Sequence, residues 1–168
     1  EGKTTTAVNL ALVLAEAGHR VVLVEGDLRR PRVSKYLGLV GSVGLSTVLY
    51  GQADVDDVLQ PTRFPGVDVL ASGPLPPNPS ELLGSEASRT VMATLRSRFD
   101  YVVVDAPPLL PVTDASVITA HADGALVVAR HGHTKRDEIV RAIGNLTQVG
   151  APVLGLILTM TPTKGRKD

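Results

Sequence analysis

The chain has 168 residues, of which 17 are lysine or arginine and 17 are aspartate or glutamate, so its formal net charge at pH 7 is zero. Proteins that coat nucleic acid and polybasic membrane arms both depend on accumulated positive charge, and the balance argues against both. The lack of cysteine excludes disulfide frameworks, iron–sulfur clusters and thiol catalysis. This length is typical of one domain with one hydrophobic core.

Short apolar runs, rich in β-branched residues, alternate with helical segments along the chain. The runs cover residues 21–24, 67–70, 101–104, 125–129 and 153–158. Continuous apolar runs of this length are typical of strands covered on both faces, as in a parallel sheet. Strand and helix in repetition imply right-handed crossovers. We therefore predict an α/β fold with a doubly wound, mostly parallel sheet and helices on both faces.

Three helices have clear sequence signals. The first covers residues 4–17 and is apolar on nearly every side, which predicts a mostly buried helix. The second begins at Pro79, a residue that suits the first helical position, pauses at Gly84 and continues to Arg98. The third covers residues 135–149 and is amphipathic.

The stretch over residues 38–79 has a different texture. It is rich in glycine, proline, aspartate and serine, with short helical pieces around residues 45–50 and 55–59. Long loops in compact domains are often functional. The stretch is therefore either an elaborated surface connection or a segment that binds a substrate or a partner.

The chain opens with Gly2-Lys3-Thr4 directly ahead of the first helix. This is the second half of the phosphate-binding pattern G-x-x-x-x-G-K-S/T, the Walker A loop. In that pattern the glycine lets backbone N–H groups approach a phosphate, the lysine reaches the β and γ oxygens, and the hydroxyl can ligate Mg²⁺. The first glycine and the strand before it are not in the sequence. We expect residues 1–168 to be a single P-loop domain, truncated at its N-terminus inside this loop, with the first strand missing.

Two of the apolar runs lead into carboxylates that can complete a magnesium site. The first run leads into Glu25 and, two residues later, Asp27; the third leads into Asp105 in the form of a Walker B strand. Open α/β sheets bind ligands at the carboxyl ends of their strands. The plainer interpretations are that Asp105 ends an ordinary strand, and that Asp27 caps a helix or pairs with Arg29 or Arg30.

Four segments together resemble the cytoplasmic catalytic domain of the bacterial tyrosine kinases of capsular and exopolysaccharide synthesis. They are E-G-K-T-T-T-A-V-N-L-A from residue 1, V-E-G-D-L-R-R-P from residue 24, N-P-S-E-L-L from residue 78 and F-D-Y-V-V-V-D-A-P-P from residue 99. The resemblance covers essentially the whole chain, and D-L-R-R-P separates this family from general P-loop ATPases better than G-K-T does. It implies an ATP-dependent protein-tyrosine kinase that autophosphorylates and regulates polysaccharide synthesis and chain length.

By position, the resemblance implies that ATP and Mg²⁺ are the cofactor pair and that one set of residues binds the nucleotide. This set is Gly2, Lys3, Thr4, Thr5 and Arg130. Lys3 would be the phosphate-binding lysine, Thr5 a phosphate contact, and Arg130 part of the strand-to-helix turn that lines the nucleotide cleft.

The resemblance also implies the catalytic and metal-binding residues. Lys3, Asp27 and Asp105 would be catalytic, and Thr4, Asp27 and Asp105 would serve the metal. Asp105 would hold Mg²⁺ directly or through water. Asp27 would lie beside the γ-phosphate and orient or deprotonate an incoming tyrosine hydroxyl.

The partners implied are a membrane-spanning polysaccharide chain-length regulator, separate or fused, further copies of the chain, and a protein tyrosine substrate, with no nucleic acid. The implied location is the cytoplasm, at the inner face of the cell membrane. No apolar run in the sequence approaches the roughly 20 residues of a membrane span.

The sequence departs from the pattern of the family in three ways. Glu25 stands where aspartate is usual, and Thr159 stands where an asparagine commonly contacts adenine. The third departure concerns the phosphoacceptor, because the sequence has only three tyrosines and none in a tail. We predict that Tyr101 is buried on its strand and that Tyr36 and Tyr50 are packing residues. The acceptor tyrosine then lies outside residues 1–168 or on another protein.

Two other functions are compatible with these residues. The first is an ATPase of the ParA and MinD type, which shares the fold and the acidic strand ends. The second is a non-catalytic, nucleotide-binding regulatory module of a polysaccharide export complex. The segments D-L-R-R-P and N-P-S-E-L-L favour the kinase.

Overall fold

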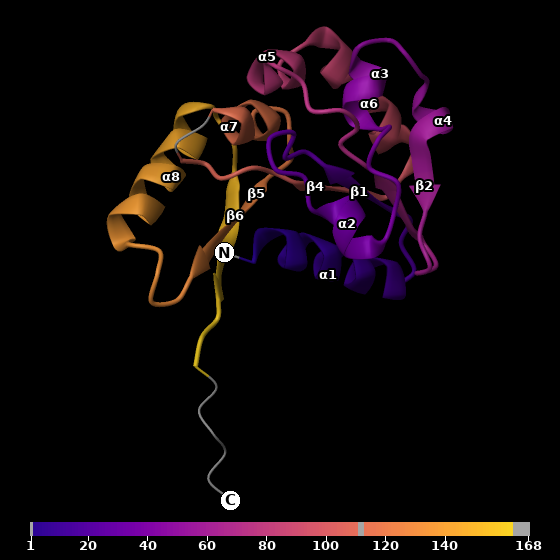
Figure 1. The fold of residues 1–168 in the computed structure, drawn as a ribbon. Coiled ribbons are helices and arrows are strands. Elements are labelled where there is room, and N and C mark those ends of the chain that lie inside the picture. The colour runs from indigo at the N-terminus through magenta and orange to yellow at the C-terminus, as the bar shows by residue number, and fades with distance from the viewer. Residues whose placement is uncertain (1, 111–112, 163–168) are drawn as a thin grey trace, which may run out of the picture.

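The structure is a computed structural model that describes residues 2–110 and 113–162. Within these residues the chain forms six strands and eight helices (Figure 1). The strands are β1 (Val21–Glu25), β2 (Leu59–Pro61), β3 (Val67–Leu70), β4 (Tyr101–Asp105), β5 (Ala125–Arg130) and β6 (Val153–Thr159). The helices are α1 (Lys3–Glu16), α2 (Val33–Leu37), α3 (Leu45–Leu49), α4 (Val55–Val58), α5 (Pro79–Leu83), α6 (Glu86–Arg98), α7 (Asp114–Thr119) and α8 (Arg136–Gln148).

All five apolar runs form strands, and the three helices with clear signals are present. The predicted pause at Gly84 is confirmed, because α5 ends at Leu83 and α6 begins at Glu86. The side chain of Ser85 caps α6 by accepting a hydrogen bond from the Ser88 N–H. The short elements β2, α2 and α7 were not predicted. Each has at most six residues, too few for a hydrophobic period to show.

The strands form two sheets, in which the strands are mostly parallel. The first has the order β2-β3-β1-β4, in which β1 is parallel to both β3 and β4 and the edge strand β2 is antiparallel. The second is the parallel pair β5–β6. Pairing of β1 with β4 sets Glu25 beside Asp105, so the carboxyl ends of the two strands lie at one edge.

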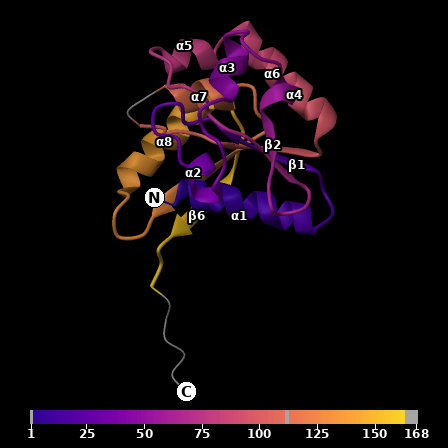
Figure 2. The same cartoon turned by 45° about the vertical axis from the view of Figure 1, so that its right-hand side comes forward.

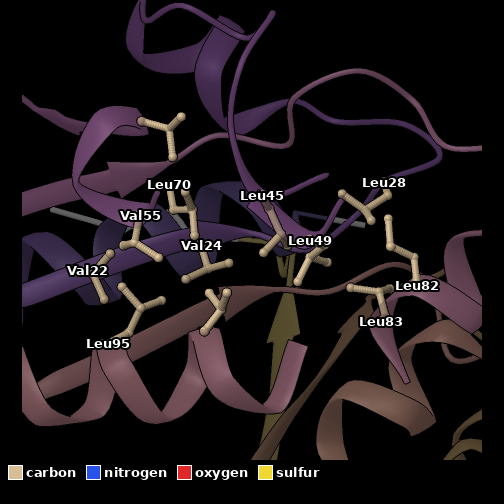
Figure 3. Close-up of a cluster of buried hydrophobic side chains, with 12 residues drawn as sticks. Val22, Val24, Leu28, Leu45, Leu49, Val55, Leu70, Leu82, Leu83 and Leu95 are labelled. Atoms are coloured by element: carbon tan, nitrogen blue, oxygen red, sulfur yellow. The ribbon is translucent and has the colours of Figure 1, made fainter. Parts of the chain in front are cut away.

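Helices cover both faces of the four-stranded part, as predicted (Figures 1 and 2). On one face, α3, α5 and α6 pack over Val22, Val24 and Leu70, and Figure 3 shows these side chains meeting those of the helices. On the other face, α1 and α2 pack over Val21 and Leu23. Side chains alternate between the faces of a strand, so the continuous run in β1 supplies both layers.

The prediction that the first helix is mostly buried is wrong. Only Val8 and Ala11 of α1 are buried, and Val13 is 61% exposed. One stripe of α1 packs on the sheet, while its other side lines a groove of about 370 Å³ together with Leu126 of β5 and Ile157 of β6. On that side Leu10 is partly buried and Val13 is exposed.

The prediction that Tyr101 is buried is also wrong, and Tyr36 and Tyr50, which were predicted to be packing residues, are exposed. Tyr36 is 57% exposed, Tyr50 52% and Tyr101 43%. Tyr101 begins β4, and its ring meets that of His19 edge-on at 5.0 Å, which covers one side only. Tyr36 and Tyr50 lie at the ends of the short helices α2 and α3, which have too few turns to bury a ring of that size.

No helix among residues 2–110 and 113–162 combines the length and the hydropathy that a membrane-spanning helix needs.

The core of the first face gives a test of the packing. Leu95 of α6 is fully buried in this cluster. We expect Leu95→Ala to lower the free energy of unfolding by about 2–5 kcal/mol, because it removes buried methyl groups and leaves a cavity. Urea denaturation followed by circular dichroism measures the change. The control is Val140→Ala on α8, where the side chain is 61% exposed; an equal loss in both variants would contradict the described packing.

Candidate functional site

The start of α1 lies against the carboxyl end of β4. The Thr4 hydroxyl donates a hydrogen bond of 2.7 Å to Oδ2 of Asp105, which joins two residues that are 101 positions apart in the chain. Because β1 is parallel to β4 and in register with it, Glu25 at the end of β1 lies at the same edge. The sequence-predicted hydroxyl and the Walker B carboxylate are thus in direct contact.

Gly2 sets the geometry of the helix start. Its φ of 86° lies in the left-handed region, where residues with a Cβ are strained. Its carbonyl accepts hydrogen bonds from both the N–H and the hydroxyl of Thr6. A Cβ at this position would also lie 3.4 Å from Cγ2 of Thr159, so the tight turn brings the helix start close to the end of β6. The first N–H groups of α1 give this edge a partial positive charge, which favours a bound anion.

Asp105 is the buried carboxylate of the site, with 4% of its surface exposed. Burial raises the pKa of Asp105 above the ordinary aspartate value, while the Thr4 hydrogen bond and the charge of Lys3 pull it down. The negative charges of Asp27 and Glu25 act in the same direction as burial. The net pKa of Asp105 is raised. Lys3 and Asp27 are therefore electrostatic neighbours of Asp105, and the structure brings the three predicted catalytic residues together.

Asp27 is held in a tight turn. Its Oδ1 accepts hydrogen bonds from the backbone N–H groups of Arg29, at 3.2 Å, and Arg30, at 2.9 Å. Asp27 therefore caps a turn, whereas the plainer interpretation made it a helix cap or a side-chain partner of Arg29 or Arg30; the next helix, α2, begins only at Val33. A carboxylate has two oxygens and about four acceptor positions. The capping role thus leaves the same group able to accept a proton or to face a metal ion.

The guanidinium of Arg29 does not pair with Asp27. It forms two hydrogen bonds with Asp114 instead, from Nε to Oδ2 at 2.6 Å and from Nη2 to Oδ1 at 3.1 Å. Asp114 opens α7 and is fully buried. Sequence reasoning missed this contact, because nothing in the pattern of either segment links positions 85 residues apart.

Glu25 has a structural position that the sequence left open. It is fully buried, its Oε1 accepts from the N–H of Ser34 at 3.2 Å, and its Oε2 accepts from the N–H of Ser72 at 2.9 Å. The first bond closes the loop that carries Asp27, since Ser34 lies in α2 just beyond that loop. The extra methylene of glutamate, compared with aspartate, gives the carboxylate reach to both donors.

Thr5 and Arg130 are the exposed members of the predicted set of site residues. Thr5 is exposed on α1 and lines the groove toward β5 and β6. Arg130 is exposed at the end of β5 and pairs in register with Thr159, the residue that Gly2 approaches. Thr159 donates its hydroxyl to the carbonyl of Ala129 at 3.2 Å. The ends of β5 and β6 thus adjoin the start of α1.

The oxygen atoms at this edge could ligate a magnesium ion whose remaining ligands come from a nucleotide and water. The described residues contain no group of three or more histidine, aspartate or glutamate side chains arranged to hold a metal by themselves. Mg²⁺ in nucleotide sites is usually held by one or two carboxylates, phosphate oxygens and water. The hydroxyl of Thr4 beside the carboxylate of Asp105, with Asp27 nearby, is such a partial set.

The two acceptor bonds of Glu25 can be tested separately from any activity. We expect Glu25→Gln to lower the free energy of unfolding by about 1–3 kcal/mol, because an amide NH₂ would face one of the two backbone donors and leave it unsatisfied. Chemical denaturation measures this change. Glu16→Gln, at an exposed glutamate of α1, is the matched control and should cost almost nothing. If the Glu25→Gln variant is as stable as the unmodified protein, the two hydrogen bonds that Glu25 accepts do not stabilise the fold.

Comparisons with known proteins agree with this geometry. A family model described as an AAA domain matches residues 1–148. Among solved structures, the chimerical protein CapA2B2 superposes with a TM-score of 0.93 at 34% identity, over 96% of this chain and 72% of that one. The septum site-determining protein MinD of Pyrococcus horikoshii, complexed with Mg-ADP, superposes with a TM-score of 0.78 at 26% identity, over 94% of this chain and 64% of that one.

The chain is also similar in sequence to curated tyrosine-protein kinases. The chain is 38% identical over 158 residues to the tyrosine-protein kinase YwqD of Bacillus subtilis, covering 94% of this chain and 67% of YwqD. It is 37% identical over 157 residues to the tyrosine-protein kinase ptk of Acinetobacter johnsonii, where the match spans only 21% of the relative. The chain therefore belongs to the AAA-domain family and to the family of bacterial tyrosine-protein kinases that YwqD represents.

Proposed function

We propose that this chain is the catalytic domain of an ATP-dependent protein-tyrosine kinase, one that autophosphorylates and acts in capsular or exopolysaccharide synthesis. The observation that carries the proposal is the hydrogen bond from Thr4 to Asp105, at the start of a glycine-capped helix. It places a hydroxyl, a buried carboxylate and the neighbouring Lys3 and Asp27 at one edge of a parallel sheet. The names of the relatives support the same activity.

The residues at this edge bind and orient the nucleotide. Lys3 and the N–H groups at the start of α1 hold the β- and γ-phosphates, with Gly2 keeping the backbone close and Thr5 adding a contact. Thr4 and Asp105 would hold Mg²⁺, with Asp27 on the same side. The ion, when bound, neutralises the charge that develops on the transferred phosphoryl group.

Asp27 acts on the nucleophile. The tyrosine oxygen forms a bond to the γ-phosphorus while the bond to the bridging oxygen of ADP breaks, and the Asp27 carboxylate accepts the hydroxyl proton. Lys3 stabilises the negative charge on the transferred group and on the departing ADP. Arg130, at the end of β5, lines the cleft on the side of the nucleotide. Most of the rate increase in this type of reaction comes from positioning and charge neutralisation.

The resemblance of the motifs extends the proposal to partners. The kinase works with a membrane-spanning polysaccharide chain-length regulator, separate or fused, at the cytoplasmic face of the cell membrane. It forms homo-oligomers and phosphorylates tyrosines of a protein substrate.

A second candidate function is supported by one specific comparison. MinD with Mg-ADP shares the fold at a TM-score of 0.78, and an ATPase of that type needs the same Lys3, Thr4 and Asp105. In that case water replaces the tyrosine hydroxyl as the nucleophile. A regulatory module that binds nucleotide without transferring phosphate is the third possibility. Products separate the three: phosphotyrosine, free phosphate alone, or neither.

Loss of the phosphate-binding lysine tests the proposal directly. In the full-length protein supplied with ATP and Mg²⁺, we expect Lys3→Ala to reduce phosphotyrosine formation by about 100-fold or more, since it removes a charge aimed at the transferred group. Mass spectrometry of the phosphopeptides measures the product. Lys35→Ala, at an exposed lysine of α2, should leave the rate unchanged. Hydrolysis of ATP without any phosphotyrosine, even with the membrane partner present, would transfer the assignment to the ATPase.

The raised pKa of Asp105 predicts how nucleotide binding depends on pH. Protonated Asp105 cannot ligate Mg²⁺, and because burial raises its pKa, the proton competes at a higher pH than at an ordinary aspartate of pKa about 3.9. Magnesium-dependent affinity should therefore fall as the pH drops toward that pKa, by about tenfold per pH unit below it. Titration with a fluorescent ATP analogue, with and without Mg²⁺, measures the change. An Asp105→Asn variant that keeps the same pH profile would refute the assignment of the proton to Asp105.

A further inference from the structure

Three segments of the chain meet at the buried carboxylate of Asp114. The first is the turn that holds Asp27, which supplies the Arg29 guanidinium through two hydrogen bonds of 2.6 and 3.1 Å. The second is the start of α5, where the Ser80 hydroxyl donates to Oδ1 of Asp114. The third is the start of α7, which carries Asp114 itself and the preceding Thr113, whose hydroxyl lies 3.2 Å from that of Ser80.

The contact with Arg29 has the geometry of a specific pair. The planar guanidinium presents two N–H groups to the two oxygens of one carboxylate, an arrangement that fixes orientation as well as distance. Asp114 is fully buried, whereas the side chain of Arg29 is 43% exposed. A buried carboxylate needs such partners. Burial acts to raise the pKa of Asp114, but the hydrogen bonds from Arg29 and Ser80 outweigh it, so the pKa is lowered and the group stays charged.

Arg29 connects this carboxylate with the candidate base. Its side chain is held by Asp114, and its backbone N–H donates to Oδ1 of Asp27 at 3.2 Å. Asp27 has only the neighbouring N–H of Arg30 as a further capping donor in the described residues. The orientation of the Asp27 turn is therefore tied to a point 85 residues away in the sequence.

The same contact links the two acidic strand ends of the site. Asp27 follows β1, and the segment from Asp105 at the end of β4 leads to Asp114 at the start of α7. The Arg29–Asp114 pair thus bridges the segments that follow two neighbouring parallel strands. A shift of either segment would change the distance between Asp27 and the hydroxyl–carboxylate pair of Thr4 and Asp105.

We propose that Arg29 and Asp114, with Ser80 as a further hydrogen-bond donor to Asp114, are positioning residues that hold the Asp27 carboxylate in the geometry required for phosphoryl transfer. The proposal rests on the proposed function. In this role Arg29 acts through the turn and Asp114 acts through Arg29, without contact of either side chain with the nucleotide or the acceptor hydroxyl. The pair therefore affects the rate of transfer more than the binding of ATP.

The test uses the full-length protein and the variant Arg29→Lys, which keeps the positive charge but loses the two-pronged contact. Phosphotyrosine formation and ATP hydrolysis are both measured, so that the effect of the variant on kcat can be determined for whichever of the two reactions the unmodified protein catalyses. We expect kcat to fall about 10- to 100-fold, as for a misplacement of about 1 Å, with KM for ATP changed by less than about twofold. The matched control is Arg96→Lys, at an arginine paired with Asp123 by one contact of 3.1 Å on the exposed surface.

A double variant separates positioning from stability. Asp114→Asn alone leaves Arg29 without its partner and lowers the melting temperature, whereas Arg29→Met combined with Asp114→Asn removes both charges. We expect the double variant to recover most of the melting temperature while kcat stays low. Recovery of kcat together with stability, or unchanged kcat in Arg29→Lys, would overturn the positioning role. Hydrolysis without phosphotyrosine, but with the Arg29 effect intact, would overturn the kinase and keep the positioning role; an unmodified protein that catalyses neither would overturn both.

Discussion

The parallel, in-register pairing of β1 with β4 is the constraint on which the site depends. It brings Glu25 and Asp105 to neighbouring positions at one edge of the sheet, and the turn after β1 then presents Asp27 on the same side. The hydrogen bond from Thr4 to Asp105 adds the start of α1 to this edge. Since the side-chain period of a strand is two, a slip of one residue in this register would turn Asp105 to the opposite face, away from Thr4.

Four carboxylates near this edge are stabilised in four different ways, which allows them to serve different purposes. Glu25 accepts hydrogen bonds from two backbone N–H groups, and Asp114 accepts from a guanidinium and the Ser80 hydroxyl, so the protein itself supplies partners for both. Asp27 accepts from two N–H groups through one oxygen. Asp105 has the Thr4 hydroxyl and the charge of Lys3 against strong desolvation, and its pKa is raised. The least compensated carboxylate is thus the one that gains most from a bound cation.

Local sequence patterns predicted the features that depend on residues close together along the chain. The apolar runs predicted the strands, and the glycine and acidic strand ends predicted which residues would meet at the edge. The burial of Tyr101 depends instead on which strands flank β4, which its own alternation does not show. The roles of Arg29 and Glu25 depend on Asp114 and Ser72, both far away in sequence. Contacts of that kind arise from the tertiary fold and leave no period or motif in either segment.

The choice of nucleophile is the point at which a kinase and an ATPase on this fold must differ. In the proposed function Lys3, Thr4 and Asp105 act on the phosphates and the metal, and they are equally useful whether water or a tyrosine hydroxyl attacks. Discrimination therefore falls to the groups that orient the incoming oxygen, and the turn from Asp27 to Pro31 is the part of the edge that lies outside the phosphate-binding set. The hydrogen bond from the Ser34 N–H to Glu25 closes the loop that carries this turn, and the Arg29–Asp114 pair holds the middle of the turn. A family can thus keep its phosphate chemistry while changing its acceptor through the contacts that shape this one turn.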